Sequence, residues 1–256
     1  MGELRKQRAY QRRIKRARRC IACLLIGSVI FLFGKTVQFS RSIKTINRVE
    51  YEQKNYPKSL IDLAERNPEA VSFVRYYEKY DGDPDTIDVS GEIHKGEIPL
   101  FLQWDERWGY ETYGNDFLAV TGCGPTCLSM VYCGITGRSD LNPYAMAKLA
   151  EREGYYVAGS GSSWNMMEGL ASEIGLQVDS VVFDEAHIRK LLQEGKPVIC
   201  IMGPGDFTTT GHFIVLTGIG DNGDVLVNDP NSKKNSEKSW SIEKLIPQIR
   251  NLWTYS

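Results

Sequence analysis

The stretch Thr121–Met130, which reads Thr-Gly-Cys-Gly-Pro-Thr-Cys-Leu-Ser-Met, places a cysteine at the predicted start of a helix. Pro125 suits the first helical turn, and apolar residues at helical spacing follow it to about Gly137. At a helix N-terminus, unpaired backbone N–H groups and the helix dipole stabilise a thiolate. Cys123 is therefore a candidate nucleophile. The alternative for this cysteine, taken alone, is a small apolar residue that packs at the helix start.

Charge is distributed unevenly along the 256-residue chain, whose net charge is −1. Residues 1–19 contain nine Lys or Arg residues and one acidic residue, so the rest of the chain is acidic. A nucleic-acid-binding face on the main domain is not expected, because such a face needs clustered basic side chains. The basic run alone is compatible with a nucleic-acid-binding arm, but the apolar run that follows it favours a membrane.

An uncharged apolar run occupies residues 20–34, and a semi-apolar stretch continues past Lys35 to residue 39. The run is shorter than the roughly 20 residues of a simple transmembrane helix, but the ammonium group of Lys35 can extend to the membrane surface. A cleavable signal peptide is the alternative, although no small-residue cleavage site follows the run. We expect residues 20–39 to anchor the chain in a lipid bilayer, with residues 1–19 in the cytoplasm and the remainder outside the cell.

Residues 40–97 are predicted to form a helical stalk and linker. Apolar residues at helical spacing indicate three short helices, the second beginning after Pro57 and the third near Pro68. Glycines and acidic residues between 82 and 97 indicate a loose linker at the end of this segment. The main domain is then predicted to cover residues 98–256.

Helical patterns precede strand patterns in the main domain, which is typical of an α+β fold. An Asn-Pro pair marks the start of the second helix, and a serine marks the start of the third. An Asn-Gly turn joins the last two strand signals as a hairpin. The predicted helices cover residues 123–137, 143–153, 163–174, 184–194 and 242–249, and the predicted strands cover 176–178, 181–183, 197–202, 212–218 and 225–229.

Two further polar residues lie at the ends of predicted strands. His212 begins an apolar strand after a glycine-rich loop, where its side chain can face a cleft. Asp229 ends the next strand, so its carboxylate can orient the His212 imidazole, while Asn228 points to the opposite face. The alternatives are a half-buried strand histidine for His212 and a plain turn residue for Asp229.

A fourth candidate, Gln103, lies upstream in Leu-Phe-Leu-Gln-Trp. Its NH2 group can donate to a developing oxyanion together with the backbone N–H of Cys123, and the alternative is a turn or solvent-facing role. Together the four candidates suggest a Cys–His–Asp nucleophilic site with an amide oxyanion donor. Their order along the chain, Gln, Cys, His and Asp, matches that of the papain fold.

Four motifs in this order resemble the bacteriocin-processing, double-glycine-leader peptidase family of papain-like cysteine peptidases, in its stand-alone branch. The resemblance extends over about residues 98–252. The lead-in before it resembles the N-terminal segment of membrane-anchored bacterial members. The motifs are Ile-Pro-Leu-Phe-Leu-Gln-Trp-Asp at 98–105, Gly-Cys-Gly-Pro-Thr-Cys-Leu-Ser-Met at 122–130, Gly-His-Phe-Ile-Val-Leu-Thr-Gly at 211–218 and Val-Asn-Asp-Pro at 227–230.

The resemblance implies a papain-like α+β fold, with N-terminal helices, a nucleophile at a helix start and a C-terminal antiparallel sheet. It implies Cys123 as nucleophile, His212 as base and Asp229 as orienting acid. It also implies Gln103 as oxyanion donor, a peptide or protein substrate and no cofactor. Cys127 matches a non-catalytic cysteine of the family and shares a helix face with Cys123. No further ligands lie at a zinc-binding spacing, so no metal is expected.

Three residues are candidates for substrate binding: Gly122, Gly211 and Trp164. The loop at 203–210 is a further candidate wall, and core packing is the alternative for Trp164. Gly122 stands where transporter-linked members of the family typically carry Asp. A phosphate-binding P-loop motif is absent from the sequence, so the chain is not the exporter itself.

The sequence therefore predicts a membrane-anchored extracytoplasmic cysteine peptidase. Two alternatives stay open at this point: a peptide-binding module of the same fold without catalysis, and a cell-wall amidase or other acyl-transfer enzyme. Cleavage of double-glycine leaders is not expected, because exporter-linked peptidase domains act on the cytoplasmic side whereas this domain is predicted to lie outside.

Overall fold

The computed structural model describes residues 47–82 and 84–256. The predicted basic tail (1–19) and membrane anchor (20–39) lie outside the described residues. Among the residues that are described, no helix has the length and apolar character needed to cross a bilayer. Residues from Arg48 to Ser256 form one compact unit.

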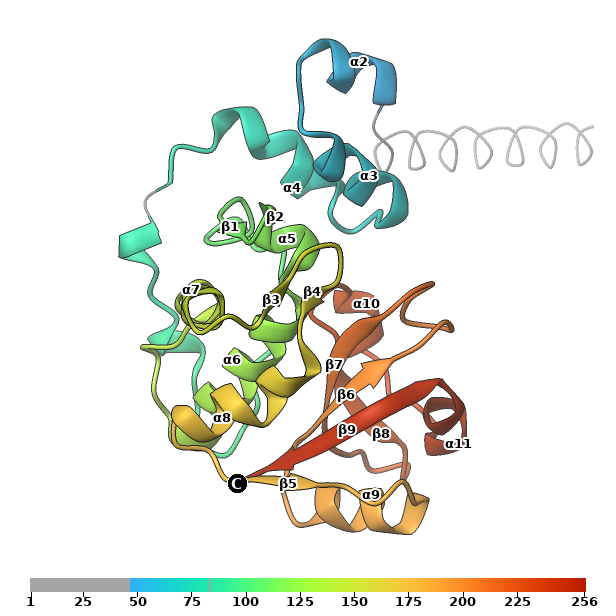
Figure 1. Ribbon diagram of the computed structural model, residues 1–256. Coiled ribbons are helices and arrows are strands. Elements are labelled where there is room, and N and C mark those ends of the chain that lie inside the picture. Colours follow the sequence, from blue (N-terminus) through green and yellow to red (C-terminus); the bar gives the residue numbers. More distant parts are fainter. Residues whose placement is uncertain (1–46, 83) are drawn as a thin grey trace, which may run out of the picture. The chain divides into compact units, whose positions relative to one another are not determined.

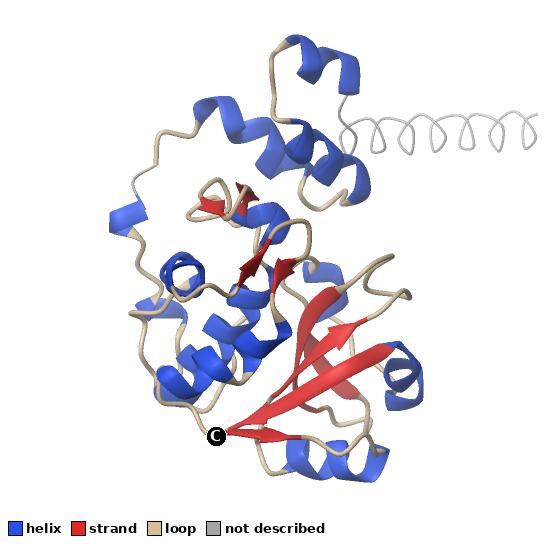
Figure 2. Ribbon diagram, viewed as in Figure 1, coloured by secondary structure: helices blue, strands red, loops and turns tan. Residues whose placement is uncertain are grey.

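A five-stranded antiparallel sheet forms one half of this unit (Figures 1 and 2). The strand order is β5-β9-β6-β7-β8, and the α+β class predicted from the sequence is confirmed. The three predicted strands beyond residue 195 are present as well. The strands are β5 (Val178–Ser180), β6 (Val198–Met202), β7 (His212–Ile219), β8 (Val225–Asn228) and β9 (Ile249–Tyr255).

Both faces of the sheet are covered, which explains why β6 and β7 have continuous apolar sequences. Ile199 and Ile201 face the helical half of the domain, where the larger core lies. Val198 and Cys200 face the opposite layer, because successive side chains of a strand alternate between faces. That layer contains α9 (Glu185–Gln193) and α11 (Ile242–Leu245).

The helical half is built around α6 (Cys123–Thr136), which packs against β7 and is buried over most of its length. Gly137 ends α6 in a left-handed conformation with φ 75°, which glycine adopts without strain. The side chain of Asn142 accepts a hydrogen bond from the backbone of Ala145 and caps α7 (Pro143–Arg152). Both helices were predicted from the sequence and are confirmed.

The predicted helix at 163–174 is interrupted. A 3-10 turn, η4 (Trp164–Met167), precedes α8 (Gly169–Glu173), and Ser163 caps the turn. The predicted strand at 176–178 is shifted to β5, and 181–183 is not a strand. Val182 and Phe183 are exposed there, so these apolar side chains do not pack as strand residues of the sheet would.

The predicted helix at 242–249 is wrong in its second half. Helix α11 ends at Leu245, η5 (Ile246–Gln248) follows, and Ile249 begins β9, which lies between β5 and β6. A register shift opposite Ile201 and Met202 leaves two consecutive β9 residues, Arg250 and Asn251, exposed. This irregularity removes the strict alternation by which strands are recognised in a sequence.

A helical lead-in packs on the domain and consists of α2 (Arg48–Gln53), α3 (Lys58–Arg66) and α4 (Val71–Tyr76). Phe73 stacks on Tyr110 with ring centroids 4.1 Å apart. The 3-10 turn η1 (Tyr77–Lys79) follows α4. The segment at 82–97 was predicted as a loose linker, but it contains the 3-10 turns η2 (Pro84–Thr86) and η3 (Ser90–Glu92). Val89 is buried in the main core, so this segment is packed rather than loose.

Candidate active site

Cys123 is the first residue of α6 and is partly exposed, as expected for a nucleophile at a helix start. A four-residue helix, α5 (Leu118–Thr121), leads directly into it through Gly122. The Gly122 N–H donates to the Leu118 carbonyl at 2.8 Å, and a Cβ at Gly122 would lie only 2.5 Å from that oxygen. The absence of a side chain at Gly122 therefore allows the tight junction that presents Cys123.

His212 and Asp229 form a buried pair. His212 opens β7 opposite Met202, and its Nε2 lies 2.7 Å from Oδ1 of Asp229. The two residues are 6% and 1% exposed, so water does not compete for this contact. Because Nε2 is bound to the carboxylate, Nδ1 is the ring nitrogen left to interact with the thiol of Cys123.

The electrostatics of the site favour a thiolate beside an imidazolium. Burial raises the pKa of the Cys123 thiol, but the hydrogen bond and charge of His212 and the backbone N–H groups of Phe213 and Gly124 outweigh it and leave the pKa below its ordinary value. Burial lowers the pKa of His212, but Asp229, and then Cys123, raise it above its ordinary value. These opposite shifts describe one coupled pair of groups that shares a proton.

Asp229 is held by contacts on both of its carboxylate oxygens. Oδ1 also accepts the backbone N–H of Asn231 at 2.9 Å, and Oδ2 accepts Nδ2 of Asn235 at 2.8 Å. Asn235 comes from the four-residue helix α10 (Lys233–Ser236) and was missed in the sequence. A polar residue in a short polar helix carries no local pattern, and only its contact with Asp229 identifies it.

Gln103 is buried beside the segment that leads to the nucleophile. Its Nε2 donates to the carbonyl of Ala119 in α5 at 2.7 Å. This contact uses one of the two amide hydrogens, so a second one is left for another acceptor. Oε1 of Gln103 has no hydrogen-bond partner in the described part of the chain. The solvent-facing alternative for Gln103 is therefore wrong.

Asn228 points away from His212, as predicted. Its Nδ2 donates to the carbonyls of Ile98 and Pro99, each at 3.0 Å. The chain just upstream of Gln103 is thereby attached to the end of β8.

The cleft beside Cys123 and His212 has a volume of about 610 Å³. Trp164, a candidate substrate-binding residue, lines it and is 47% exposed, so the core alternative for Trp164 is wrong. Gly211 also lines the cleft, as do Gly203, Pro204 and Thr210 of the predicted wall loop. Gly122 is not a lining residue; it serves the α5–α6 junction.

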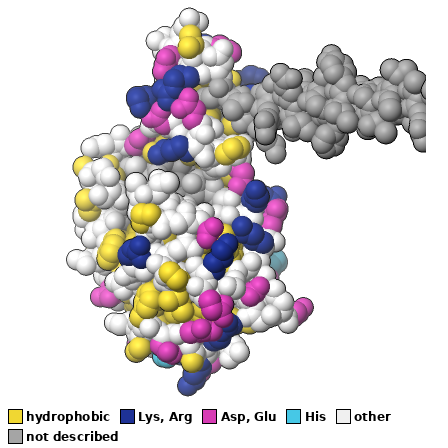
Figure 3. All heavy atoms as spheres, turned by 90° about the vertical axis from the view of Figure 1, so that its right-hand side faces the viewer, with side chains coloured by type: hydrophobic (Ala, Val, Ile, Leu, Met, Phe, Trp, Pro, Cys, Tyr) yellow, Lys and Arg dark blue, Asp and Glu magenta, His cyan; other side chains and the backbone are white. Residues whose placement is uncertain are grey.

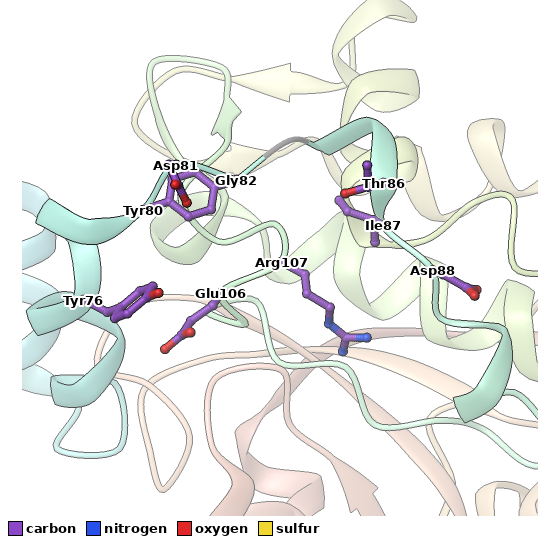
Figure 4. A pocket seen from close by; sticks show the side chains of 9 residues that line it. All are labelled: Tyr76, Tyr80, Asp81, Gly82, Thr86, Ile87, Asp88, Glu106 and Arg107. Carbon is purple, nitrogen blue, oxygen red and sulfur yellow. The ribbon is translucent and has the colours of Figure 1, made fainter.

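A second pocket of about 420 Å³ lies at the lead-in and is shown in Figure 4. It contains no cysteine or histidine, so it lacks the nucleophile and base of the first cleft. The lining residues of the second pocket are Tyr76, Tyr80, Asp81, Gly82, Thr86, Ile87, Asp88, Glu106 and Arg107.

On the face shown in Figure 3, basic and acidic side chains are interspersed and form no continuous basic surface.

Comparison with known proteins adds two matches. Residues 95–255 match the Peptidase_C39 like family. The structure is similar to the crystal structure of the peptidase domain of Streptococcus ComA, a bifunctional ABC transporter involved in a quorum-sensing pathway. That similarity covers 52% of this chain and 89% of the ComA domain, at 20% sequence identity and a TM-score of 0.40. No curated protein sequence matches the chain.

Proposed function

We propose that this chain, which belongs to the Peptidase_C39 like family, hydrolyses peptide bonds with Cys123 as its nucleophile. Membership of that family makes the chain a papain-like cysteine peptidase, and the roles of individual residues are the proposal. The observation that carries it is the buried pair of His212 and Asp229, 2.7 Å apart, together with the cleft of about 610 Å³ that His212 and Cys123 both line.

In the first half of the reaction, the Cys123 thiolate attacks the carbonyl carbon of the scissile peptide bond and forms a C–S bond. The negative charge that develops on the carbonyl oxygen is stabilised by the Cys123 backbone N–H and the second amide hydrogen of Gln103. His212 gives its proton to the nitrogen of the leaving amine as the C–N bond breaks. A thioester remains on Cys123.

In the second half, neutral His212 takes a proton from a water molecule, and the resulting hydroxide attacks the thioester. The C–S bond breaks, the carboxylic acid product leaves, and the thiolate–imidazolium pair is restored. Asp229 accepts a hydrogen bond from Nε2–H throughout, which keeps Nδ1 directed at the reacting atoms and stabilises the imidazolium.

The test is a peptide-library digest with the full-length chain, analysed by mass spectrometry, alongside Cys123→Ala and the control Cys133→Ala. Cys133 is buried, and burial raises its pKa to about 11, so its removal is expected to leave cleavage in place. Cys123→Ala is expected to abolish both cleavage and alkylation of the peptide that contains residue 123. Cleavage at the wild-type rate by Cys123→Ala would refute the assignment.

The same digest separates the two alternatives. A catalytically silent module would bind peptides and release no products. An acyl-transfer enzyme would release products joined to an added amine in place of water, because both reactions pass through the same thioester. The lowered pKa of Cys123 favours a working nucleophile over the silent module.

We also propose, from the sequence, that residues 20–39 anchor the chain in the bacterial cell membrane and that the catalytic domain lies outside the cell. The support is the uncharged run preceded by nine basic residues within 1–19. Protease added to intact cells is expected to remove the domain, and membrane fractionation is expected to retain the chain. Recovery in the soluble fraction of a shortened chain would instead indicate a cleaved signal peptide.

A further inference from the structure

The cleft that contains Cys123 is lined by few charged side chains. Apart from His212 they are Arg66, Arg250 and Asp116. Asp116 already accepts hydrogen bonds at Oδ1 from the Ser59 hydroxyl at 2.7 Å and from the backbone of Phe117 at 2.8 Å. Two guanidinium groups therefore outnumber the single carboxylate among the charges that line this cleft.

Arg66 ends α3, in the lead-in, and lies outside the family match at 95–255. Its Nε donates to the backbone carbonyl of Asp62 at 3.1 Å. The next residue, Asn67, donates from Nδ2 to the carbonyl of Asn231 at 2.7 Å. Asn231 is two residues from Asp229, so this contact holds Arg66 beside the turn that follows Asp229.

Arg250 reaches the cleft from the second position of β9. A Cβ at Gly203 would lie 2.5 Å from Nε of Arg250, so the guanidinium occupies the space that a side chain at Gly203 would need. One terminal nitrogen donates to the carbonyls of Pro247 at 3.0 Å and Ile249 at 3.3 Å. The rest of the guanidinium has donors left for a ligand.

Neither arginine forms an ion pair with a carboxylate in the described part of the chain. This is notable because residues 47–256 contain 31 acidic and 19 basic residues, and carboxylate partners are abundant. Five other arginines do form ion pairs with carboxylates: Arg48, Arg107, Arg138, Arg152 and Arg189.

We propose that Arg66 and Arg250 bind acidic side chains of the substrate near the scissile bond, so that this peptidase selects acidic peptides. The inference rests on the proposed function of Cys123. Guanidinium groups bind carboxylates through paired, charge-assisted hydrogen bonds, and the partly enclosed cleft strengthens them. The acidic surroundings repel acidic peptides elsewhere, which confines their binding to these two positions.

The first experiment measures kcat/KM for fluorogenic peptides that differ only in Glu, Gln or Lys at each position flanking the cleaved bond. The full-length wild type is expected to prefer Glu over Gln at one or more positions. Arg66→Gln and Arg250→Gln are each expected to reduce that ratio by roughly ten- to a hundredfold, the range for a lost charge-assisted hydrogen bond. Arg152→Gln, whose side chain is exposed and lies outside the cleft, is expected to leave the ratio unchanged.

The second experiment is independent of turnover. Fluorescence anisotropy measures binding of labelled Glu/Gly, Gln/Gly and Lys/Gly dodecapeptides to Cys123→Ala and to Cys123→Ala with Arg66→Glu. The first protein is expected to bind the Glu peptide most tightly, and the second to shift its preference toward Lys. Equal binding of Glu and Gln peptides, or tighter binding of the Lys peptide by the first protein, would overturn the inference.

These two measurements distinguish two kinds of failure. Acid-selective binding without cleavage by any active protein would refute the role of Cys123 and leave the arginine site intact. Cleavage that depends on Cys123 but is indifferent to Glu, Gln and Lys would refute the arginine site alone.

Discussion

The backbone N–H of Gln103 donates to the carbonyl of Pro230 at 2.7 Å. Pro230 directly follows Asp229, so the candidate oxyanion donor and the residue that orients His212 are attached through adjacent backbone. Asn228 adds two hydrogen bonds to the same upstream segment. Residues more than a hundred positions apart in the chain are thus held as one support for the site.

Replacement of Gln103 by Ala is expected to lower kcat by about 10²–10³-fold with a small change in KM, because the lost donor acts on charge that develops in the transition state. The backbone bond to Pro230 survives this change. Steady-state kinetics and a thermal unfolding curve are the measurements. A loss of kcat that appears only alongside a collapsed melting temperature would indicate a structural role for Gln103 instead.

Alkylation of Cys123 is expected to continue below the pH at which an ordinary thiol loses reactivity, because its pKa is lowered. The rate should fall as pH drops through that lowered pKa. In His212→Ala, burial without the imidazolium should move the dependence to higher pH. Iodoacetamide labelling across pH, read by mass spectrometry at residue 123, measures both. An identical profile in the two proteins would contradict the ion pair.

Turnover is expected to decline at alkaline pH as well, once pH passes the raised pKa of His212. Above it, the imidazole is neutral and lacks the proton that the leaving amine needs. The pH profile of kcat/KM should therefore be a bell whose two limbs belong to the coupled pair. A profile that rises to a plateau through the alkaline range would exclude His212 as the acid.

Asn235→Ala is expected to reduce kcat by roughly ten- to a hundredfold, the range for loss of a hydrogen bond to a charged group. The lost bond is the 2.8 Å contact that fixes Oδ2 of Asp229. A positioning role also predicts that the Cys123 labelling profile shifts, since Asp229 supports the charge on His212. The control is Asn222→Ala, in the exposed turn after β7. Equal kinetics in both variants would count against the role of Asn235.

Gly122→Ala is expected to destabilise the fold by about 1–3 kcal/mol, the range for overpacking, because the new Cβ meets the Leu118 carbonyl at 2.5 Å. Gly91→Ala is a matched control, since a Cβ there has no heavy atom within 4 Å. Urea denaturation of both variants gives the comparison. Equal midpoints would show that the α5–α6 junction relaxes without cost.

Most of the candidate site could be predicted from the sequence, because most of its residues lie at recognisable positions in local sequence patterns. Cys123 lies at a helix start, His212 at a strand start and Asp229 just beyond a strand end, and such positions can be identified from hydrophobic periodicity and turn residues. The helices at Cys123 and Asn142–Pro143 are found for the same reason.

Features that depend on distant contacts could not be found this way. Strand β9 was missed, and its first residue, Ile249, was assigned to the end of a helix, because the pairing of β9 with β6 is irregular. Asn235 is identified only by its contact with Asp229 in the turn after β8, and Arg66 only by its position at the cleft. No local sequence pattern indicates either role. Trp164 has helical spacing with buried residues, yet it lies in a 3-10 turn that exposes it.

The end of α3 lies beside the turn that follows Asp229, and this position bears on how substrate preference can evolve. The terminal residue of α3, Arg66, faces the cleft, while the next residue, Asn67, makes the contact with Asn231. Substitutions at position 66 can therefore alter which peptides are accepted without disturbing any group that makes or breaks bonds. Related proteins can thus differ in substrate preference at the end of one helix while they keep the same catalytic residues.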